Sequence, residues 1–187
     1  VPEDRIVSHV AAAVRGGAWE IRLSAQDTGV YGHEIGSDLP SLLTKITAIG
    51  GDFRVRLGML TPSSLRGISR KLLTCYGSKK IYKFLHVPLQ SGSDRILANM
   101  QRSYTAETFL EQVRLFTSVH PRLTLLTDVI VGYPGETSQD FKETCSVLEA
   151  VRPDKTHIAR FSPRPFTDAC SLPQLPEAIK RERSIAL

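Results

Sequence analysis

The sequence contains little cysteine and no long apolar run. Only Cys75, Cys145 and Cys170 occur in 187 residues, at a spacing that matches neither a disulfide framework nor a metal motif. We therefore expect a protein of the reducing cytoplasm. No apolar stretch approaches the roughly 20 residues of a membrane span, and the first residues lack the basic end and apolar core of a signal peptide, so no membrane partner is expected.

Several familiar catalytic patterns are missing as well. No P-loop, Ser-His-Asp order, paired-carboxylate pattern or histidine-rich metal site stands out. The hydrophobic content of 41% and charged content of 23% are ordinary for a globular chain, and the length allows one domain over 1–187. The net charge of +5 suits an acidic partner such as RNA, although many domains carry this charge without binding nucleic acid.

The apolar periodicity alternates between strand and helix. Strands are predicted to begin near 19, 53, 81, 124 and 156, and a basic helix is predicted over about 176–187. This alternation predicts an α/β fold with a parallel sheet. Asp38, Ser93, Thr105 and the pair Thr137-x-x-Asp140 are predicted helix caps, and the helix after Thr137 is expected to bury Phe141, Cys145 and Leu148. Periodicity alone does not choose between an open sheet and part of a barrel.

Polar and glycine residues follow each predicted strand, most clearly in 125–136, where a β-branched run ends in Gly-Tyr-Pro-Gly-Glu. In parallel α/β folds ligands bind at the carboxyl ends of strands, so these residues are expected to face one pocket. The residues are Ser24, Gln26, Asp27, Gly58, Met59, His86, Gln90, Ser91, Asp128, Gly132, Glu136, Arg160, Ser162 and Arg164. Alternatively, Asp27-Thr28-Gly29 and Pro134-Gly135 are plain turns and His86 is a core histidine. The residues alone predict a ligand-binding domain without a defined reaction.

Taken together, four segments resemble the radical S-adenosylmethionine methylthiotransferases. They are 20–32 (EIRLSAQDTGVYG), 84–94 (FLHVPLQSGSD), 127–137 (TDVIVGYPGET) and 161–165 (FSPRP), and the match runs in order through essentially the whole chain. Arg56-Leu57-Gly58-Met59 and Gln26-Asp27-Thr28-Gly29 are most similar to the archaeal and eukaryotic branch. That branch methylthiolates threonylcarbamoyladenosine beside the tRNA anticodon.

The resemblance implies a partial (β/α) barrel of the radical SAM type that lacks its first strand and cluster loop. It implies S-adenosylmethionine and 4Fe-4S clusters as cofactors. The implied cofactor-binding residues are Ser24, Gln26, Asp27, His86, Gln90, Ser91, Asp128, Gly132, Gly135, Glu136, Phe161 and Ser162, and the implied substrate-binding residues are Arg160 and Arg164. The implied partners are tRNA, an electron donor and a sulfur donor.

Two departures from the family stand out. The Cys-x3-Cys-x2-Cys loop that holds the cluster is missing, so its cysteines are expected upstream of Val1, and no metal ligand or catalytic residue is assigned within the chain. The chain is expected to be an inactive catalytic-core fragment. Phe166 also stands where the family usually has glycine.

Three alternative functions remain open at this point. A sister methylthiotransferase would act on isopentenyladenosine in tRNA or on a ribosomal protein. A barrel without its cluster could serve as a non-catalytic RNA-binding or assembly module, and an ordinary metabolite-binding domain is the third alternative.

Overall fold

The computed structural model describes residues 1–187 and divides into two compact units. The first unit comprises residues 1–86 and 115–124, and the second comprises 87–114 and 125–187. Helix α5 (Ala106–Val119) contributes residues to both. None of the helices combines the length and hydropathy that crossing a bilayer requires.

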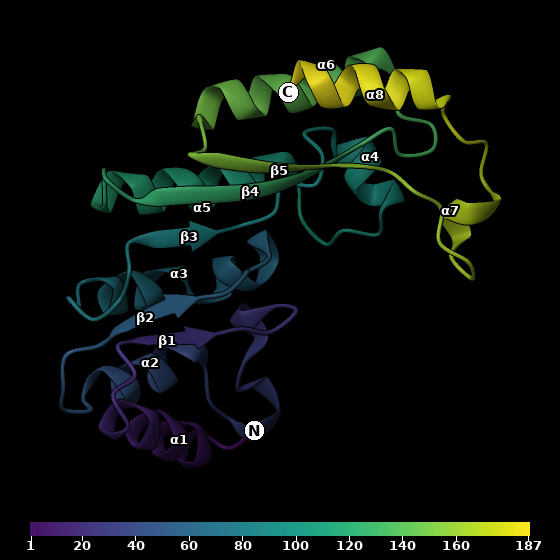
Figure 1. Cartoon of the computed structure of the whole chain (residues 1–187). Helices are drawn as coiled ribbons and strands as arrows, with labels where there is room; N and C mark the ends of the chain where they lie inside the picture. The colour runs from purple at the N-terminus through teal and green to yellow at the C-terminus, as the bar shows by residue number, and fades with distance from the viewer. The chain divides into compact units, whose positions relative to one another are not determined.

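The first unit holds two paired parallel strands and the helices that follow them. Its elements are α1 (Glu3–Arg15), β1 (Glu20–Leu23), the 3₁₀ turns η1 (Thr28–Val30) and η2 (His33–Ile35), α2 (Leu39–Thr47), β2 (Arg54–Leu57), α3 (Pro62–Tyr76) and β3 (Phe84–His86). β1 pairs with β2 in register from Glu20 opposite Arg54 to Leu23 opposite Leu57. α1 packs on α2 and α2 on α3 (Figure 1).

The second unit repeats this strand–helix pattern. Its elements are α4 (Asp94–Asn99), β4 (Thr124–Val131, of which Thr124 belongs to the first unit), α6 (Ser138–Val151), β5 (Lys155–Arg160), α7 (Asp168–Ser171) and α8 (Glu177–Ala186). β4 and β5 are parallel, from Leu126 opposite Lys155 to Val131 opposite Arg160. The terminal helix α8 packs against β5 (Figure 1). The prediction of an α/β fold with parallel strands is confirmed.

Helix caps follow local chemistry closely. The Asp38 carboxylate accepts from the Ser41 backbone N–H at 2.8 Å, and Thr105 Oγ1 accepts from the Thr108 N–H at 3.1 Å. Thr137 and Asp140 form the full capping box. Ser93 occupies the predicted N-cap position of α4, but its side chain makes no capping bond and reaches Asp140 instead.

The predicted buried side of α6 is wrong. Phe141, Cys145 and Leu148 are only half-buried, whereas Asp140, Thr144 and Val147 are buried. The polar face turns inward because it hydrogen-bonds the loop at 91–93, which an apolar face could not do. The strand predicted over Ile81–Val87 is also shorter than expected, since Ile81 makes only a single parallel bridge to Val55.

Candidate functional site

The exit loop of β1 is held by the Asp27 carboxylate. That carboxylate accepts from the Gly29 N–H at 2.9 Å, the Thr61 hydroxyl at 2.7 Å and the Ser64 hydroxyl at 2.9 Å. It thereby ties this loop to the start of α3. Asp27 therefore has the turn role of the alternative prediction, and its contact with a cofactor stays a prediction.

Other predicted residues of the first unit have less specific surroundings. Gln26 is exposed, and Ser24 lines a cavity of about 240 Å³ together with Leu23 and Tyr31. The His86 carbonyl accepts from the Leu60 N–H at 2.9 Å. Ser24, Gln26, Asp27, Gly58, Met59 and His86 thus lie in the first unit, while the other predicted site residues lie in the second.

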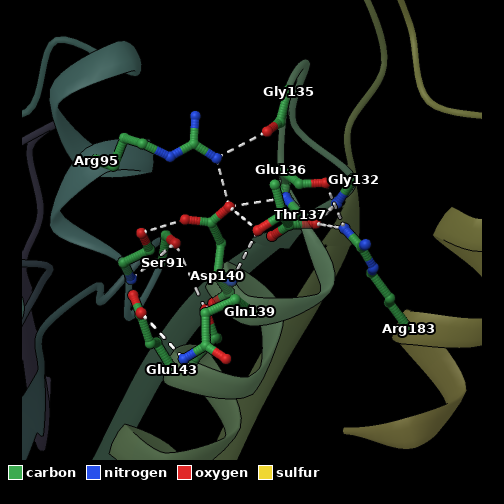
Figure 2. Close-up of polar contacts among 12 residues, drawn as sticks. Ser91, Arg95, Gly132, Gly135, Glu136, Thr137, Gln139, Asp140, Glu143 and Arg183 are labelled. Carbon is green, nitrogen blue, oxygen red and sulfur yellow. Dashed lines mark hydrogen bonds and ion pairs between the residues drawn. The ribbon is translucent and has the colours of Figure 1, made fainter.

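The exit loop of β4 is built around the buried Glu136 side chain. Its Oε2 accepts from the Gly132 N–H at 2.6 Å and from the Arg183 guanidinium at 2.5 Å, and the Arg183 side chain is 9% exposed (Figure 2). Burial raises the pKa of the Glu136 carboxyl, against the lowering effect of the Gly132 N–H and Arg183. Glu136 therefore shapes the loop from inside, and its predicted contact with a ligand is not tested by this geometry.

Glycine suits position 132 better than a residue with a side chain. Its φ of +74° lies in the left-handed region, and a Cβ there would lie 2.4 Å from the Lys180 side chain. Lys180 itself donates to the Phe161 carbonyl at 3.1 Å and to Glu177 at 2.8 Å. Lys180 and Arg183 of α8 therefore hold the ends of both β5 and β4.

The loop that contains Gln90 and Ser91 is fastened to α6. Ser91 is fully buried and its hydroxyl accepts from the Ser93 N–H at 3.2 Å, while the Thr144 hydroxyl accepts from the Gly92 N–H at 2.9 Å. Gly92 has no room for a side chain, since a Cβ would lie 2.5 Å from the Thr144 Cα. Gln90 takes a φ of +65° and bridges to β4 through its own backbone.

Asp140 is the centre of the polar network in this region. It accepts from the Ser93 hydroxyl at 2.6 Å, from both the N–H and hydroxyl of Thr137, and from Arg95 (Figure 2). Burial works against ionisation, but the hydrogen bonds from Arg95, Ser93 and Thr137 outweigh it and hold the pKa of Asp140 well below its ordinary value. Arg95 also donates to the Gly135 carbonyl at 2.8 Å, so the network reaches the β4 exit loop.

The remaining predicted residues lie in the strands β4 and β5 or directly after them. Asp128 Oδ1 lies 3.0 Å from Nδ1 of His157, its partner on β5. Phe161 donates its N–H to the Val131 carbonyl at 2.8 Å, and its ring lies edge-on to Tyr133 with the centroids 5.0 Å apart. Arg160, Ser162 and Arg164 are exposed.

Sequence patterns identified only some of the residues that hold these loops. Lys180 and Arg183 were interpreted only as part of a basic helix, although their spacing of three puts both on one face of α8. Tyr133 lies in the segment 132–136 that was expected to line the pocket, but the role of its side chain was not predicted. Its hydroxyl donates to the Asn99 carbonyl at 2.8 Å and joins the β4 exit loop to the end of α4.

The three cysteines do not fit a four-iron cluster. Cys75 and Cys145 lie within the helices α3 and α6, and the spacing of the three cysteines lacks the Cys-x3-Cys-x2-Cys pattern. Burial raises the pKa of the Cys75 and Cys145 thiols, which opposes the thiolate form that iron requires. No residue of this chain is assigned to a cluster.

Comparison with protein families decides the classification. The model of the radical SAM superfamily matches residues 1–148. The chain belongs to this superfamily.

Curated relatives and solved structures agree with that membership. The chain is 45% identical over 97% of its length to the "Probable threonylcarbamoyladenosine tRNA methylthiotransferase" of Pyrococcus horikoshii, and covers 43% of that protein. It is 36% identical over 98% of its length to the human threonylcarbamoyladenosine tRNA methylthiotransferase and covers 32% of it. The chain thus spans less than half the length of these relatives.

Solved radical SAM structures share the fold at low sequence identity. Coproporphyrinogen III oxidase of Escherichia coli superposes with a TM-score of 0.70 over 98% of this chain and 44% of the oxidase, at 15% identity. The methyltransferase TsrM of Kitasatospora setae gives a TM-score of 0.71 over 90% of this chain and 30% of TsrM, also at 15% identity. The predicted radical SAM fold class, a partial (β/α) barrel, is confirmed by these comparisons.

Proposed function

We propose that this chain is the catalytic core of a radical SAM methylthiotransferase that acts on threonylcarbamoyladenosine in tRNA. The observation that carries the proposal is sequence identity of 36–48% over 97–98% of the chain with threonylcarbamoyladenosine tRNA methylthiotransferases of Pyrococcus and of humans. The described residues do not fit an iron–sulfur cluster, so the cluster ligands would come from other residues of the whole protein. The chain alone would then be inactive.

In this proposal the second unit holds the adenosine part of S-adenosylmethionine. An aromatic wall of Tyr133 and Phe161, together with Ile130, lines one side of a cavity of about 440 Å³ next to the β4 exit loop. A flat purine fits such a wall, and the Gly132 loop keeps its shape through Glu136 and Arg183. Gln90, Ser91, Asp128, Gly135, Ser162, Ser24, Gln26, Asp27 and His86 stay proposed cofactor contacts, and Arg160 and Arg164 stay proposed substrate contacts.

The bound cofactor would supply a radical that removes hydrogen from the adenine before sulfur is installed. The contribution of this chain is to position the cofactor and the base. The Asp27, Ser91 and Glu136 side chains hydrogen-bond within their own loops, so they fix the shape of the site and are not assigned a role in proton transfer. tRNA, an electron donor and a sulfur donor complete the proposed partners, and the proposed location is the cytoplasm.

Nucleoside analysis of cellular tRNA tests this function. Deleting the gene should remove the methylthio derivative and leave threonylcarbamoyladenosine in its place, and the wild-type gene should restore the methylthio derivative. Loss of the methylthio derivative of isopentenyladenosine, or of the modification of a ribosomal protein, would assign the chain to a sister enzyme. Unchanged tRNA and ribosomal protein would leave the non-catalytic alternative.

A further inference from the structure

The cavity beside Tyr133 and Phe161 has a second wall that the proposed cofactor site does not explain. This wall is formed by the end of α4 with the residues after it, and by the turn before α7 with the first residues of α7. The residues are Asn99, Met100, Gln101, Arg102, Phe166, Thr167, Asp168 and Ala169. All of these residues belong to the second unit. The Gln101 side-chain amide donates to Asp168 at 3.3 Å and connects the two segments of this wall.

Phe166 takes an unusual conformation in that turn. The Thr167 hydroxyl and N–H both donate to the Arg164 carbonyl, which closes a four-residue turn with Pro165 second and Phe166 third. Phe166 has a φ of +66°, a value that turns of this kind normally reserve for glycine. The ring is nevertheless fully exposed, so it buries no apolar surface that would offset the strain.

Backbone strain is concentrated at this cavity. Four residues other than glycine take a positive φ in the chain, and two of them, Gln101 and Phe166, line it from opposite segments. Such conformations persist at sites that clamp ligands, where the side chain has a use that outweighs the strain. The ring of Phe166 stands at the rim, with its faces open to solvent.

The charges at the rim favour RNA over the cofactor. Arg102 lines the cavity, Arg164 begins the turn that carries Phe166, and both are exposed. S-adenosylmethionine carries a net positive charge at neutral pH, since its sulfonium and ammonium groups outnumber its carboxylate, and gains nothing from these cations. A nucleic acid offers both a base for the ring and phosphates for the guanidinium groups.

We propose that Phe166 is a stacking platform for a nucleobase of the RNA substrate and that Arg102 and Arg164 bind the adjoining phosphates. The RNA base binds at the rim of the cavity, while the wall of Tyr133 and Phe161 holds the adenosine of the cofactor. This inference rests on the proposed function, because it requires that the protein acts on RNA.

Binding of an anticodon stem-loop RNA to the natural full-length protein tests the platform. Phe166→Gly should weaken binding by about tenfold, within the range that aromatic stacking contributes per base. Phe166→Trp should stay within about threefold of wild type because it keeps a flat ring. Phe166→Gly also relieves the backbone strain at this position, so the variant is expected to fold, and a loss of binding would report the loss of the ring.

Fluorescence identifies the stacked base. Stem-loops with 2-aminopurine in place of each loop adenosine in turn should show one position that is quenched by wild type and by Phe166→Trp but not by Phe166→Gly. Equal quenching by all three proteins would overturn the proposal.

A parallel titration with S-adenosylmethionine separates the two possible sources of the base. The affinity for S-adenosylmethionine should be the same in wild type and Phe166→Gly. Weaker binding of S-adenosylmethionine with unchanged RNA affinity would assign the ring to the cofactor and refute the proposal. If the wild-type protein binds no tRNA stem-loop, the proposed function fails as well, whereas RNA binding that is indifferent to Phe166 overturns this inference alone.

The phosphate contacts have their own signature. Arg102→Gln and Arg164→Gln should each weaken binding at all sequences alike and reduce the salt dependence of the affinity by about one ion per variant. Arg114→Gln, a change of the same charge on α5, is the matched control and should leave the slope unchanged. Unchanged slopes in the Arg102 and Arg164 variants would remove the phosphate contacts from the proposal.

Discussion

Phe166 holds a left-handed backbone conformation while its ring lies in solvent. Replacing it with glycine should raise the free energy of unfolding by about 1 kcal/mol, because strain is relieved and no buried surface is lost. Phe166→Ala keeps most of the strain and is the control. Urea unfolding of the three proteins measures the effect, and a glycine variant less stable than wild type would contradict it.

Glu136 and Arg183 form an ion pair in which both side chains are buried. Arg183→Met should lower the free energy of unfolding by about 3 kcal/mol, since it leaves a carboxylate buried without its cation. Glu136→Gln combined with Arg183→Met should recover part of this loss, because the amide is neutral. A complete double-mutant cycle in urea isolates the coupling, and additive losses would show that the two side chains act independently.

The positions of these residues could be predicted from the sequence better than their partners could. Glycines after an apolar run located the β4 exit loop correctly, and Asp27 was recognised in turn chemistry. The partners of Asp27, however, lie 34 and 37 residues away at Thr61 and Ser64. Arg183 lies 47 residues from Glu136, and no local pattern connects the two. The residues that contact the cofactor also remain predictions, because such contacts would likewise join residues that are far apart in the sequence.

Helix α6 begins at the capping box of Thr137 and Asp140. The Asp140 carboxylate also accepts hydrogen bonds from Ser93 and Arg95. Thr137→Ala should cost about 1 kcal/mol, the usual effect of losing an N-cap, whereas Asp140→Ala should cost about 2 kcal/mol, because the buried Ser93 hydroxyl loses its acceptor and the bonds from Arg95 and Thr137 are lost as well. Ser138→Ala, one residue into the same helix and exposed, is the matched control. Thermal unfolding ranks the variants, and equal effects at 137 and 140 would contradict the central position of Asp140.

Acid should loosen both units through carboxyls whose pKa values are depressed. Hydrogen bonds from Ser41 and Lys71 lower the pKa of Asp38 to about 2, against a small opposing effect of burial, and the pKa of Asp140 is also held down. A depressed folded pKa means that the unfolded state takes up the proton first as the pH falls. This contribution to stability is complete above about pH 5 and is lost as the pH falls from about 4 towards 2. Asp38→Asn and Asp140→Asn should each flatten the fall in stability measured by urea unfolding across this range, and an unaltered slope in both would refute the assignment.

Strand–helix alternation was predictable because apolar periodicity reflects burial directly. The inward face of α6 could not be predicted, since a polar helix face that hydrogen-bonds a buried loop has the same sequence pattern as a face exposed to solvent. Short elements escaped prediction too. The turns η1 and η2 and the helix α7 span three or four residues each, too few for any periodicity to be seen.

The last helix of the second unit, α8, binds the loops that follow β4 and β5. Ending the chain after Leu175 removes Lys180 and Arg183 together, and we expect hydrogen exchange to accelerate in β4, β5 and α6 while the first unit stays protected. Ending it after Ser184 keeps both cations and serves as the control. Acceleration in neither protein would show that α8 contributes little to the stability of this unit.

The contacts of Lys180 and Arg183 limit where natural recombination or chimera design can join this chain to another. A breakpoint placed between Phe161 and Pro176 would join the β4 and β5 ends to a foreign tail. Unless that tail happens to supply a lysine and an arginine three residues apart at the right distance, the hybrid would carry an orphaned acid in its interior. Chimeras between members of this superfamily are therefore expected to keep the chain of one parent intact through residue 183.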